Sequence, residues 1–327
     1  MRQHEDTSVD PARRARLRAN LHGILIPFTT PFDREGEVDP RALRENVGRW
    51  ARTGVAGLVA LGSTGERVHL SSEERLRVVE AARSSVGEGL SFLVGVGEHS
   101  TRGTIQDAKE AARAGADALL VITPHFYRGA LTQSALYEHY AAVADASPAP
   151  LVLYNIPQNT GVAIAPETVA RLAEHENIAG IKDSSGDMPN FMEMLRLAGG
   201  REDFVVMTGH GGLLYPSLAA GAGGAVLAVA CVLPEMCVGV LRAARAGEHE
   251  RARALQGRLL PVARAVTTRY GIGGLKFALD HVGYRGGEVR APLAMPDDAA
   301  RAEIKRLLAE VSEFHGEHAQ AQKSFQN

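Results

Sequence analysis

The feature that most constrains the fold of this chain is a repeat of eight short β-rich runs, each followed by a stretch with helical periodicity. The runs are nearly continuous in apolar residues instead of alternating, which is typical of strands covered on both faces. They occupy residues 23–28, 57–61, 91–96, 117–122, 151–155, 178–182, 204–208 and 224–228. Eight such units in about 210 residues predict a (β/α)₈ TIM barrel, for which roughly 250 residues are typical.

Helix-boundary signals fall between these runs. Asp39 and Pro40 give an N-cap followed by a proline in the first turn, and Ser71 with Glu74 forms a capping box. A doubly wound open sheet is the rival fold, but it normally has fewer strands and a glycine-rich turn after the first one. Here the first strand runs into Pro-Phe-Thr-Thr-Pro at 27–31. The barrel is therefore the better prediction.

The two ends of the chain differ from this repeat. The strand pattern stops near residue 247, and the periodicity of 251–270, 274–282 and 296–313 predicts helices. The first twenty residues lack the apolar core of a signal peptide, so they are expected to form a solvated arm or a short helix. The predicted organisation is a flexible N-terminal arm over 1–20, the barrel over 21–247 and a C-terminal helical extension over 248–327.

Composition narrows the classes of partner. A net charge of -2 argues against nucleic acid or an anionic membrane surface as a partner. The most apolar run, 225–230, is far too short to span a bilayer. Cys231 and Cys237 lie in an apolar stretch on a predicted helix, where they cannot readily bridge, so reduced core thiols and a cytoplasmic location are expected.

Lys182 is the residue that most strongly suggests chemistry. It closes the apolar stretch 178–181 and is followed by a turn, and barrel enzymes keep their catalytic groups at this end of their strands. Only five of the 36 basic residues are Lys, so a lysine here suggests a need for a primary amine, which can attack a ketone and form an imine. The alternative is a lysine that pairs with Asp183 or a nearby carboxylate.

Three other motifs fall at predicted strand ends. Gly-Ser-Thr-Gly-Glu at 62–66 exposes backbone N–H groups to a small anion, or is a glycine turn that caps the next helix. Tyr154 points either into the barrel mouth or into the core. The aromatic loop 123–129 covers a pocket or a subunit contact, or packs its own aromatic rings at the surface.

Together these motifs predict imine chemistry on a 2-oxo acid. An ordinary lysine is almost wholly protonated at neutral pH, so nucleophilic attack needs an environment that disfavours the ammonium form. A tyrosine hydroxyl can shuttle protons while the imine forms, and a neighbouring Ser or Thr hydroxyl can align it. The amides of 62–66 would hold the substrate carboxylate. Another lysine, Lys276, lies on a predicted helix and is expected to snorkel to the surface.

Metal and phosphate sites are weaker predictions. His69, His99, His125 and His210 are scattered, with no pair at ligand spacing, so no metal and no cofactor are expected. The glycines of 209–212 and 221–224 could form a phosphate cup, although close packing of helices explains them equally well.

The motifs at 62–66, 154–161 and 180–187 resemble the dihydrodipicolinate synthase / N-acetylneuraminate lyase superfamily, and the likeness extends from about residue 21 to 312. The resemblance implies that Lys182 is the Schiff-base lysine, Tyr154 the proton relay and Ser63 its hydroxyl partner. It also implies that Ser63 and Thr64 bind the pyruvyl carboxylate and that the backbone near Val226 lines the pyruvate site. Family members are commonly homotetramers, arranged as dimers of tight dimers.

Two positions depart from dihydrodipicolinate synthase. The arginine that binds the carboxylate of aspartate semialdehyde would fall at Asn159, which has no charge, and the inter-subunit tyrosine falls at Phe126, which has no hydroxyl. Tyr127 is the neighbour that could substitute for it. Motifs at 127–129, 157–161, 265–267, 274–276 and 290–293 resemble the 4-hydroxy-2-oxoglutarate aldolase branch more closely.

The leading hypothesis is therefore a class I pyruvate-dependent aldolase that cleaves a 4-hydroxy-2-oxo acid, with 4-hydroxy-2-oxoglutarate as the expected substrate, to pyruvate and an aldehyde. Because Asn159 has no charge, aspartate semialdehyde is expected to be a poor partner. Two alternatives are 4-hydroxy-tetrahydrodipicolinate (dihydrodipicolinate) synthase and a non-catalytic relative that binds 2-oxo acids. The expected assembly is a cytoplasmic homotetramer.

Overall fold

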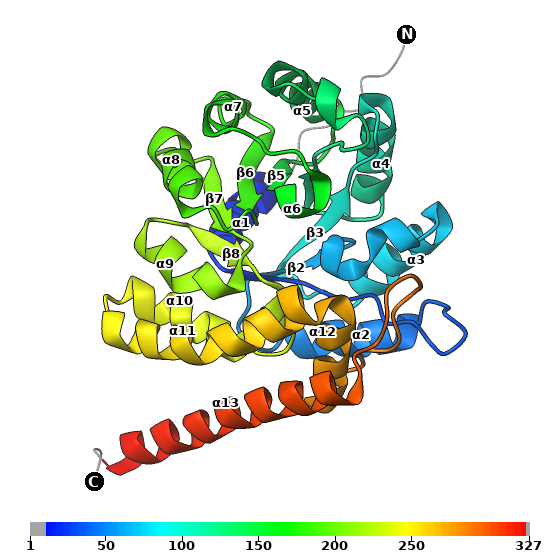
Figure 1. Ribbon diagram of the computed structural model, residues 1–327. Coiled ribbons are helices and arrows are strands. Elements are labelled where there is room, and N and C mark those ends of the chain that lie inside the picture. Colours follow the sequence, from blue (N-terminus) through cyan, green and yellow to red (C-terminus); the bar gives the residue numbers. More distant parts are fainter. Residues whose placement is uncertain (1–10, 325–327) are drawn as a thin grey trace.

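The chain folds into a closed barrel of eight parallel strands in which each strand pairs with the next and β1 pairs with β8 (Figure 1). The computed structural model describes residues 11–324. The strands are β1 (Ile24–Pro27), β2 (Gly57–Ala60), β3 (Ser91–Val96), β4 (Ala118–Ile122), β5 (Leu151–Asn155), β6 (Ile178–Asp183), β7 (Val205–Thr208) and β8 (Gly224–Val226). All eight predicted strands are present, with ends shifted by two residues at most, so the TIM-barrel prediction is confirmed.

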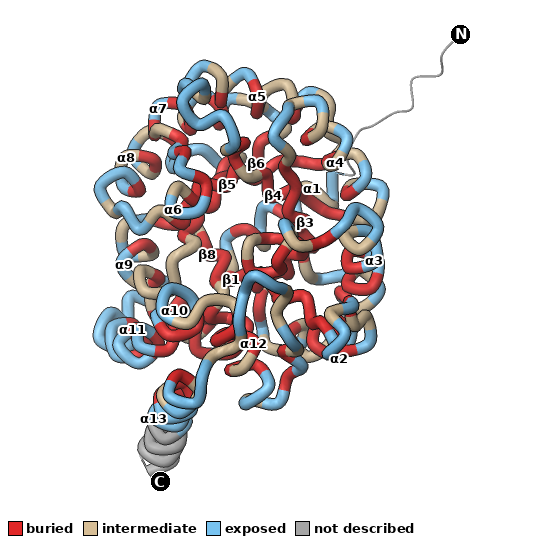
Figure 2. Tube along the Cα trace, turned by 45° about the vertical axis from the view of Figure 1, so that its right-hand side comes forward, coloured by how far each residue is buried: buried red, intermediate tan, exposed pale blue. Residues whose placement is uncertain are grey.

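Helices surround this barrel and bury their apolar faces against the outer side of the strands (Figure 2). They are α2 (Pro40–Trp50), α3 (Ser72–Arg83), α4 (Thr101–Arg113), α5 (Gln133–Ala146), α7 (Pro166–Leu172), α8 (Met188–Ala198), α9 (Leu214–Ala219) and α10 (Pro234–Arg245). The predicted caps form: Asp39 accepts from the first turn of α2, and Ser71 and Glu74 complete the capping box of α3. These caps fix where the chain turns after each strand.

The amino end of the barrel is closed by α1 (Pro11–Leu21). Leu17 and Leu21 are buried in a cluster with residues of the barrel interior. The expectation of a solvated arm is therefore wrong for this segment, and the short-helix alternative is confirmed; the rest of the predicted arm, residues 1–10, lies outside the described residues. Because α1 is rich in arginine, its sequence does not indicate that Leu17 and Leu21 are buried at the end of the barrel.

The C-terminal extension is helical, as predicted. It comprises α11 (His249–Arg264), the π-helix η6 (Ala265–Arg269), α12 (Gly271–His281) and α13 (Asp298–Ser324). α11 packs against α10, and α13 runs across α11 and α12 toward the C-terminus (Figure 1). No helix in the described part of the chain is long and apolar enough to cross a membrane.

The two cysteines lie in the core as free thiols. Cys231 is in the 3₁₀ helix η5 (Ala228–Cys231) and Cys237 in α10, so they are not on one helix. Burial raises the pKa of both thiols far above the ordinary range. Both thiols are therefore held protonated and inert, as expected for structural residues.

Candidate active site

Lys182 and Tyr154 lie side by side at the carboxyl end of the barrel. β5 and β6 pair in a register that sets Tyr154 opposite Lys182, and each residue is only 4% exposed. Lys182 Nζ lies 4.1 Å from the centre of the Tyr154 ring. The body of the tyrosine belongs to the barrel-interior cluster, whereas its hydroxyl reaches the mouth. The ring of Tyr154 therefore lies in the core and its hydroxyl at the barrel mouth, so both locations considered from the sequence apply.

No carboxylate forms an ion pair with Lys182 among residues 11–324. Asp183 bonds instead to Asn155, whose Nδ2 donates to Oδ1 at 2.6 Å, and to Ser185, whose hydroxyl donates to Oδ2 at 2.8 Å. Burial raises the pKa of Asp183, although these hydrogen bonds oppose the shift. The structure therefore excludes the alternative in which Lys182 is a salt-bridge lysine paired to Asp183.

Asn155 is a site residue that sequence reasoning missed. Its side chain joins the ends of β5 and β6, and its Oδ1 accepts from the backbone N–H of Ile164 at 3.1 Å. Asn155 and Asp183 directly follow Tyr154 and Lys182 and are partners in the same register. The signal is present in the sequence, because parallel strands that align Tyr154 with Lys182 must also align the residues after them.

The loop after β2 places Ser63 against Tyr154. The 3₁₀ helix η1 (Ser63–Gly65) brings Ser63 Oγ to 3.3 Å from the Tyr154 hydroxyl. Leu61 and Glu66, at the two ends of this loop, adopt left-handed conformations with φ of 56° and 54°, and they are the non-glycine residues of the described chain with positive φ. Such strained backbone is concentrated at functional sites.

Gly95 in β3 makes room for this loop. A Cβ atom there would lie 2.2 Å from the carbonyl oxygen of Leu61. The Gly-Ser-Thr-Gly-Glu motif therefore forms a turn with a strained backbone. This turn fits only because Gly95, on the next strand, has no side chain.

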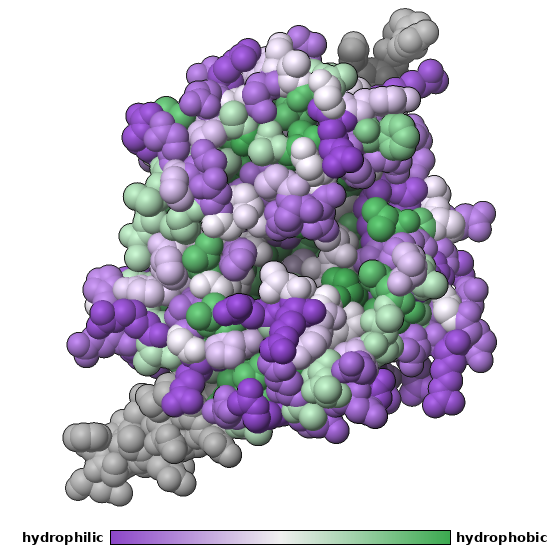
Figure 3. Space-filling view, viewed as in Figure 1, coloured by the Kyte–Doolittle hydropathy of each residue, from purple (hydrophilic) through white to green (hydrophobic). Residues whose placement is uncertain are grey.

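These residues line a cavity of about 390 Å³ at the barrel mouth, and a recess opens near the centre of the face in Figure 3. Of the predicted substrate-binding residues, the cavity wall contains Thr64, Val226 and Asn159. A second lobe of about 500 Å³ shares Ser63, Tyr154 and Asn159 with it and continues toward His125. Lys182 is the one lysine, arginine or carboxylate among the residues that line the inner lobe.

Phe126 and Tyr127 do not join this wall within one chain. They are 70% and 72% exposed, and their rings contact each other with centroids 5.0 Å apart. His99, which is itself exposed, contacts the rings of His125 and Phe126. Both residues are predicted from the sequence to contact the substrate, and this chain on its own does not bring them to the cavity.

The C-terminal extension supplies part of the wall that sequence reasoning missed. Thr267 and Thr268 of η6, together with Ile272 of α12, line the inner lobe. A π-helical turn is rare and is often found at functional sites. In the sequence, this segment is notable only for its resemblance to one branch of the family. Helical periodicity cannot show that a helix after the last strand folds back over the barrel mouth.

The glycines after β7 are explained by packing. A Cβ atom on Gly209 would lie 2.0 Å from Ser184 Oγ and 2.8 Å from Lys182 Cε. Glycine at this position therefore allows the chain to pass directly over the lysine. The packing alternative accounts for Gly209 without a phosphate cup.

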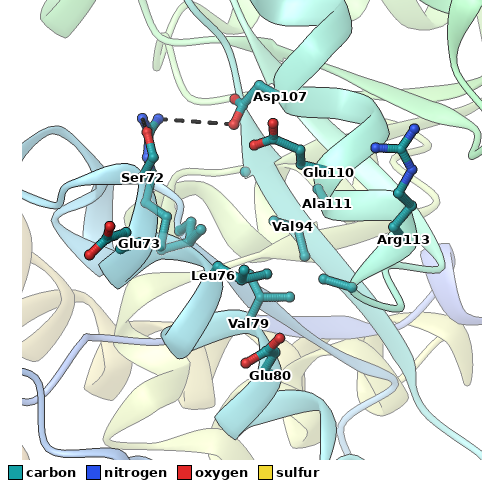
Figure 4. Close-up of a pocket in the computed structure, with 14 residues that line it drawn as sticks. Ser72, Glu73, Leu76, Val79, Glu80, Val94, Asp107, Glu110, Ala111 and Arg113 are labelled. Carbon is teal, nitrogen blue, oxygen red and sulfur yellow. Dashed lines mark hydrogen bonds and ion pairs between the residues drawn. The ribbon is translucent and has the colours of Figure 1, made fainter.

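A separate hollow lies on the outside of the barrel between α3 and α4 (Figure 4). Its wall contains the carboxylates of Glu73, Glu80 and Glu110. Neither Lys182 nor Tyr154 contributes to it. This outer groove is therefore separate from the Lys182–Tyr154 pair at the barrel mouth.

A buried lysine with no carboxylate partner among the described residues, beside a tyrosine at the mouth of a TIM barrel, is the arrangement expected of a Schiff-base class I carbon–carbon lyase. Residues 20–311 match the model of the dihydrodipicolinate synthetase family. The chain belongs to this family, whose members are class I lyases of that kind.

Individual relatives agree with this assignment. A 4-hydroxy-tetrahydrodipicolinate synthase from Hyphomonas neptunium is 40% identical over 88% of this chain and 98% of its own. An uncharacterised lyase from Halobacterium salinarum is 38% identical over 89% of this chain and 94% of its own. The crystal structure of a putative dihydrodipicolinate synthase from Thermus thermophilus, 37% identical, superposes with a TM-score of 0.81 over 89% of this chain and 99% of that one. The synthase names favour the synthase alternative over the 4-hydroxy-2-oxoglutarate aldolase branch.

Proposed function

We propose that this protein is a pyruvate-dependent lyase in which Lys182 forms an imine with pyruvate. The observation that carries the proposal is the lysine itself, buried at a strand end without a carboxylate partner in the described chain and 4.1 Å from the Tyr154 ring. A lysine amine that no carboxylate holds can reach the carbonyl carbon of a ketone bound in the cavity.

The proposed steps use groups at the same end of the barrel. The Lys182 amine attacks C2 of pyruvate, and the carbonyl oxygen leaves as water after it has gained two protons, at least one through the Tyr154 hydroxyl. Ser63 Oγ, 3.3 Å from that hydroxyl, orients it. Loss of a C3 proton from the imine then gives an enamine, whose C3 forms a bond to the aldehyde carbon. The aldehyde oxygen takes up a proton and the imine is restored, and its hydrolysis by water frees the Lys182 amine.

Pyruvate itself is proposed to lie between the loop after β2 and the end of β8. Neither Ser63 nor Thr64 donates its backbone N–H to another group among residues 11–324. These N–H groups can therefore donate to the pyruvyl carboxylate. Val226 is fully buried at the end of β8 and closes the opposite wall.

The test of this step is borohydride reduction in the presence of pyruvate, followed by peptide mass spectrometry. The expected result is one reduced pyruvyl adduct on the peptide that contains Lys182. An adduct on Lys276, or none, would contradict the proposal. Lys182→Arg serves as the matched control, since arginine keeps the positive charge but cannot form the imine.

For the second substrate we propose aspartate semialdehyde, and hence 4-hydroxy-tetrahydrodipicolinate synthesis, because relatives across nearly the whole chain carry that name. The reaction needs a cation for the aldehyde's carboxylate, which Asn159 does not provide. Arg128, in the loop after β4, lies across the end of α6 (Pro157–Thr160): a Cβ atom on Gly161 would be 2.8 Å from its Nη1. We propose that Arg128 supplies this charge.

A second candidate is aldol cleavage of a 4-hydroxy-2-oxo acid. The observation that favours it is the inner lobe, where uncharged hydrogen-bonding groups such as Gln158, Ser184 and Thr267 surround Lys182. A panel of 4-hydroxy-2-oxo acids in a pyruvate-release assay, run beside condensation of pyruvate with aspartate semialdehyde, separates the two reactions. Synthase activity requires the condensation to be the faster reaction.

The exposed pair Phe126 and Tyr127 suggests that assembly completes the site. Two large, exposed aromatic rings on one loop are typical of a protein contact. We propose that they meet a second copy of the chain in a homotetramer built from tight dimers, as the family resemblance implies. Sedimentation at micromolar concentration tests this, and Phe126→Ser should weaken the association.

A further inference from the structure

A second lysine is buried near the mouth, and its environment is opposite to that of Lys182. Lys276 in α12 has no exposed surface, and Glu66 is 1% exposed. Lys276 Nζ lies 2.6 Å from Glu66 Oε1, donates to the carbonyl oxygen of Glu288 at 2.5 Å, and lies 4.4 Å from the centre of the Phe32 ring. The expectation that Lys276 snorkels to the surface is therefore wrong.

Glu66 is also the last residue of the strained loop. Its φ of 54° is left-handed, and its other carboxylate oxygen accepts from the backbone N–H of Arg290 at 3.2 Å and contacts His69 Nδ1 at 3.2 Å. Two parts of the C-terminal extension therefore hold one side chain of the loop: α12 through Lys276 and the segment before α13 through Arg290.

The rest of the loop has few restraints of its own. Thr30 Oγ1 donates to the carbonyl oxygen of Gly65, and the N–H groups of Gly65 and Glu66 close the 3₁₀ turn on Gly62 and Ser63. The left-handed conformations at Leu61 and Glu66 are unfavourable for residues with a side chain, so surrounding contacts must maintain them. Among the contacts named here that hold the loop, those of the Glu66 side chain involve charged groups, whereas the others are hydrogen bonds between neutral groups.

Stability alone does not explain why this ion pair is present, because the pair is costly to bury. Burial lowers the pKa of Lys276 even though the Glu66 carboxylate acts to raise it. The cost of desolvation therefore offsets part of the attraction between the two charges. A buried ion pair of this kind can often be replaced by uncharged groups with no loss of stability.

We propose that the Lys276–Glu66 ion pair is a positioning device that holds loop 61–66 in the shape that presents Ser63 and Thr64 to the pyruvate carboxylate. The inference rests on the proposed function, since it assumes that pyruvate binds at this loop. Lys276 and Glu66 do not touch pyruvate in this arrangement. They act through the backbone of the loop. Because Lys276 belongs to α12, the conformation of the loop depends on the packing of α12 against it.

The test is the double variant Glu66→Gln with Lys276→Met, which removes both charges together and keeps a side-chain oxygen for Arg290. The probe is pyruvate alone: the half-saturating concentration for borohydride trapping on Lys182 is measured by mass spectrometry. We expect this concentration to rise by roughly tenfold or more while the melting temperature stays within a few degrees of the unmodified protein. A folded double variant with unchanged half-saturation would overturn the inference.

Two further variants keep the experiment decisive. If that double variant does not fold, Glu66→Gln with Lys276→Gln, which also removes both charges but keeps a donor toward residue 66 and the Glu288 carbonyl, is measured by the same two readouts. Unchanged half-saturation in this folded variant would equally overturn the inference. A matched control is Asp117→Asn, which removes a buried carboxylate at the other end of the barrel and should lower the melting temperature without changing half-saturation. Failure of the unmodified protein to trap pyruvate would instead refute the proposed function itself, so the two failures are distinguishable.

Discussion

Two buried charged residues at opposite ends of the barrel, Asp117 and Lys182, differ in how their charges are paired. At the amino end, Asp117 is 4% exposed and its carboxylate is fully partnered: Arg13 Nε lies 2.6 Å from Oδ1, Arg16 and Arg83 lie within 3.5 Å, and the backbone N–H of Phe92 donates to Oδ2 at 2.7 Å. At the carboxyl end, Lys182 is equally buried and has no carboxylate partner within the described chain. The charge of Asp117 is fully paired, whereas the Lys182 amine has no paired charge in that part of the chain.

This difference separates stability from chemistry. A carboxylate held by three arginines ties α1, β4 and α3 together and has no remaining capacity for a ligand. Lys182 lies over the Tyr154 ring and lines a cavity of about 390 Å³ next to the strained loop, so its amine has room for a ligand. The same division is found in TIM-barrel enzymes generally, which keep catalytic groups at the carboxyl ends of their strands.

The largest expected effect is at the carboxyl end. Tyr154→Phe removes the hydroxyl that contacts Ser63 and keeps the ring that packs in the barrel interior. We expect turnover to fall roughly 10²–10⁴-fold, the usual contribution of a positioned acid or base, with a much smaller change in pyruvate affinity and in melting temperature. Steady-state kinetics and a thermal melt measure both.

Ser63→Ala is the companion variant and should lower turnover in the same direction but by less. If Tyr154→Phe kept near-full turnover, Tyr154 would be a packing residue like its neighbours in the interior cluster. The contrast between the two ends of the barrel would then rest on Lys182 alone.

Sequence alone predicted the parts of this contrast that depend on local patterns. Continuous apolar runs identified the strands, and a lysine and a tyrosine at strand ends identified the mouth. Glu66 and Lys276 could not be paired in this way, because they are far apart in the sequence and nothing local shows that α12 folds back over the loop. Likewise, the two leucines that make α1 a plug are hidden among its arginines.

The intermediate effect is at the amino end. Asp117→Asn removes the charge that Arg13, Arg16 and Arg83 share. We expect a loss of about 2 kcal/mol in the free energy of unfolding, below the roughly 3–5 kcal/mol of a fully buried pair because Arg13 and Arg16 are more than a third exposed. Chemical denaturation measures it. Turnover of the folded fraction should be unchanged, and a large fall in turnover would show that the two ends are coupled.

The smallest expected effect concerns the rim of the mouth, where a charge is exposed instead of buried. Arg128→Gln removes the guanidinium that lies over Gly161. Because an exposed ion pair contributes about 1 kcal/mol at most, the KM for aspartate semialdehyde should rise by no more than about fivefold, with pyruvate half-saturation unchanged. Asn159→Arg, which places a new guanidinium on the cavity wall, should reverse the loss in the same protein. An unchanged KM in Arg128→Gln would show that Arg128 does not bind the carboxylate of aspartate semialdehyde. The proposed synthase site would then lack a cation, and aldol cleavage, which the uncharged inner lobe favours, would be the better proposal.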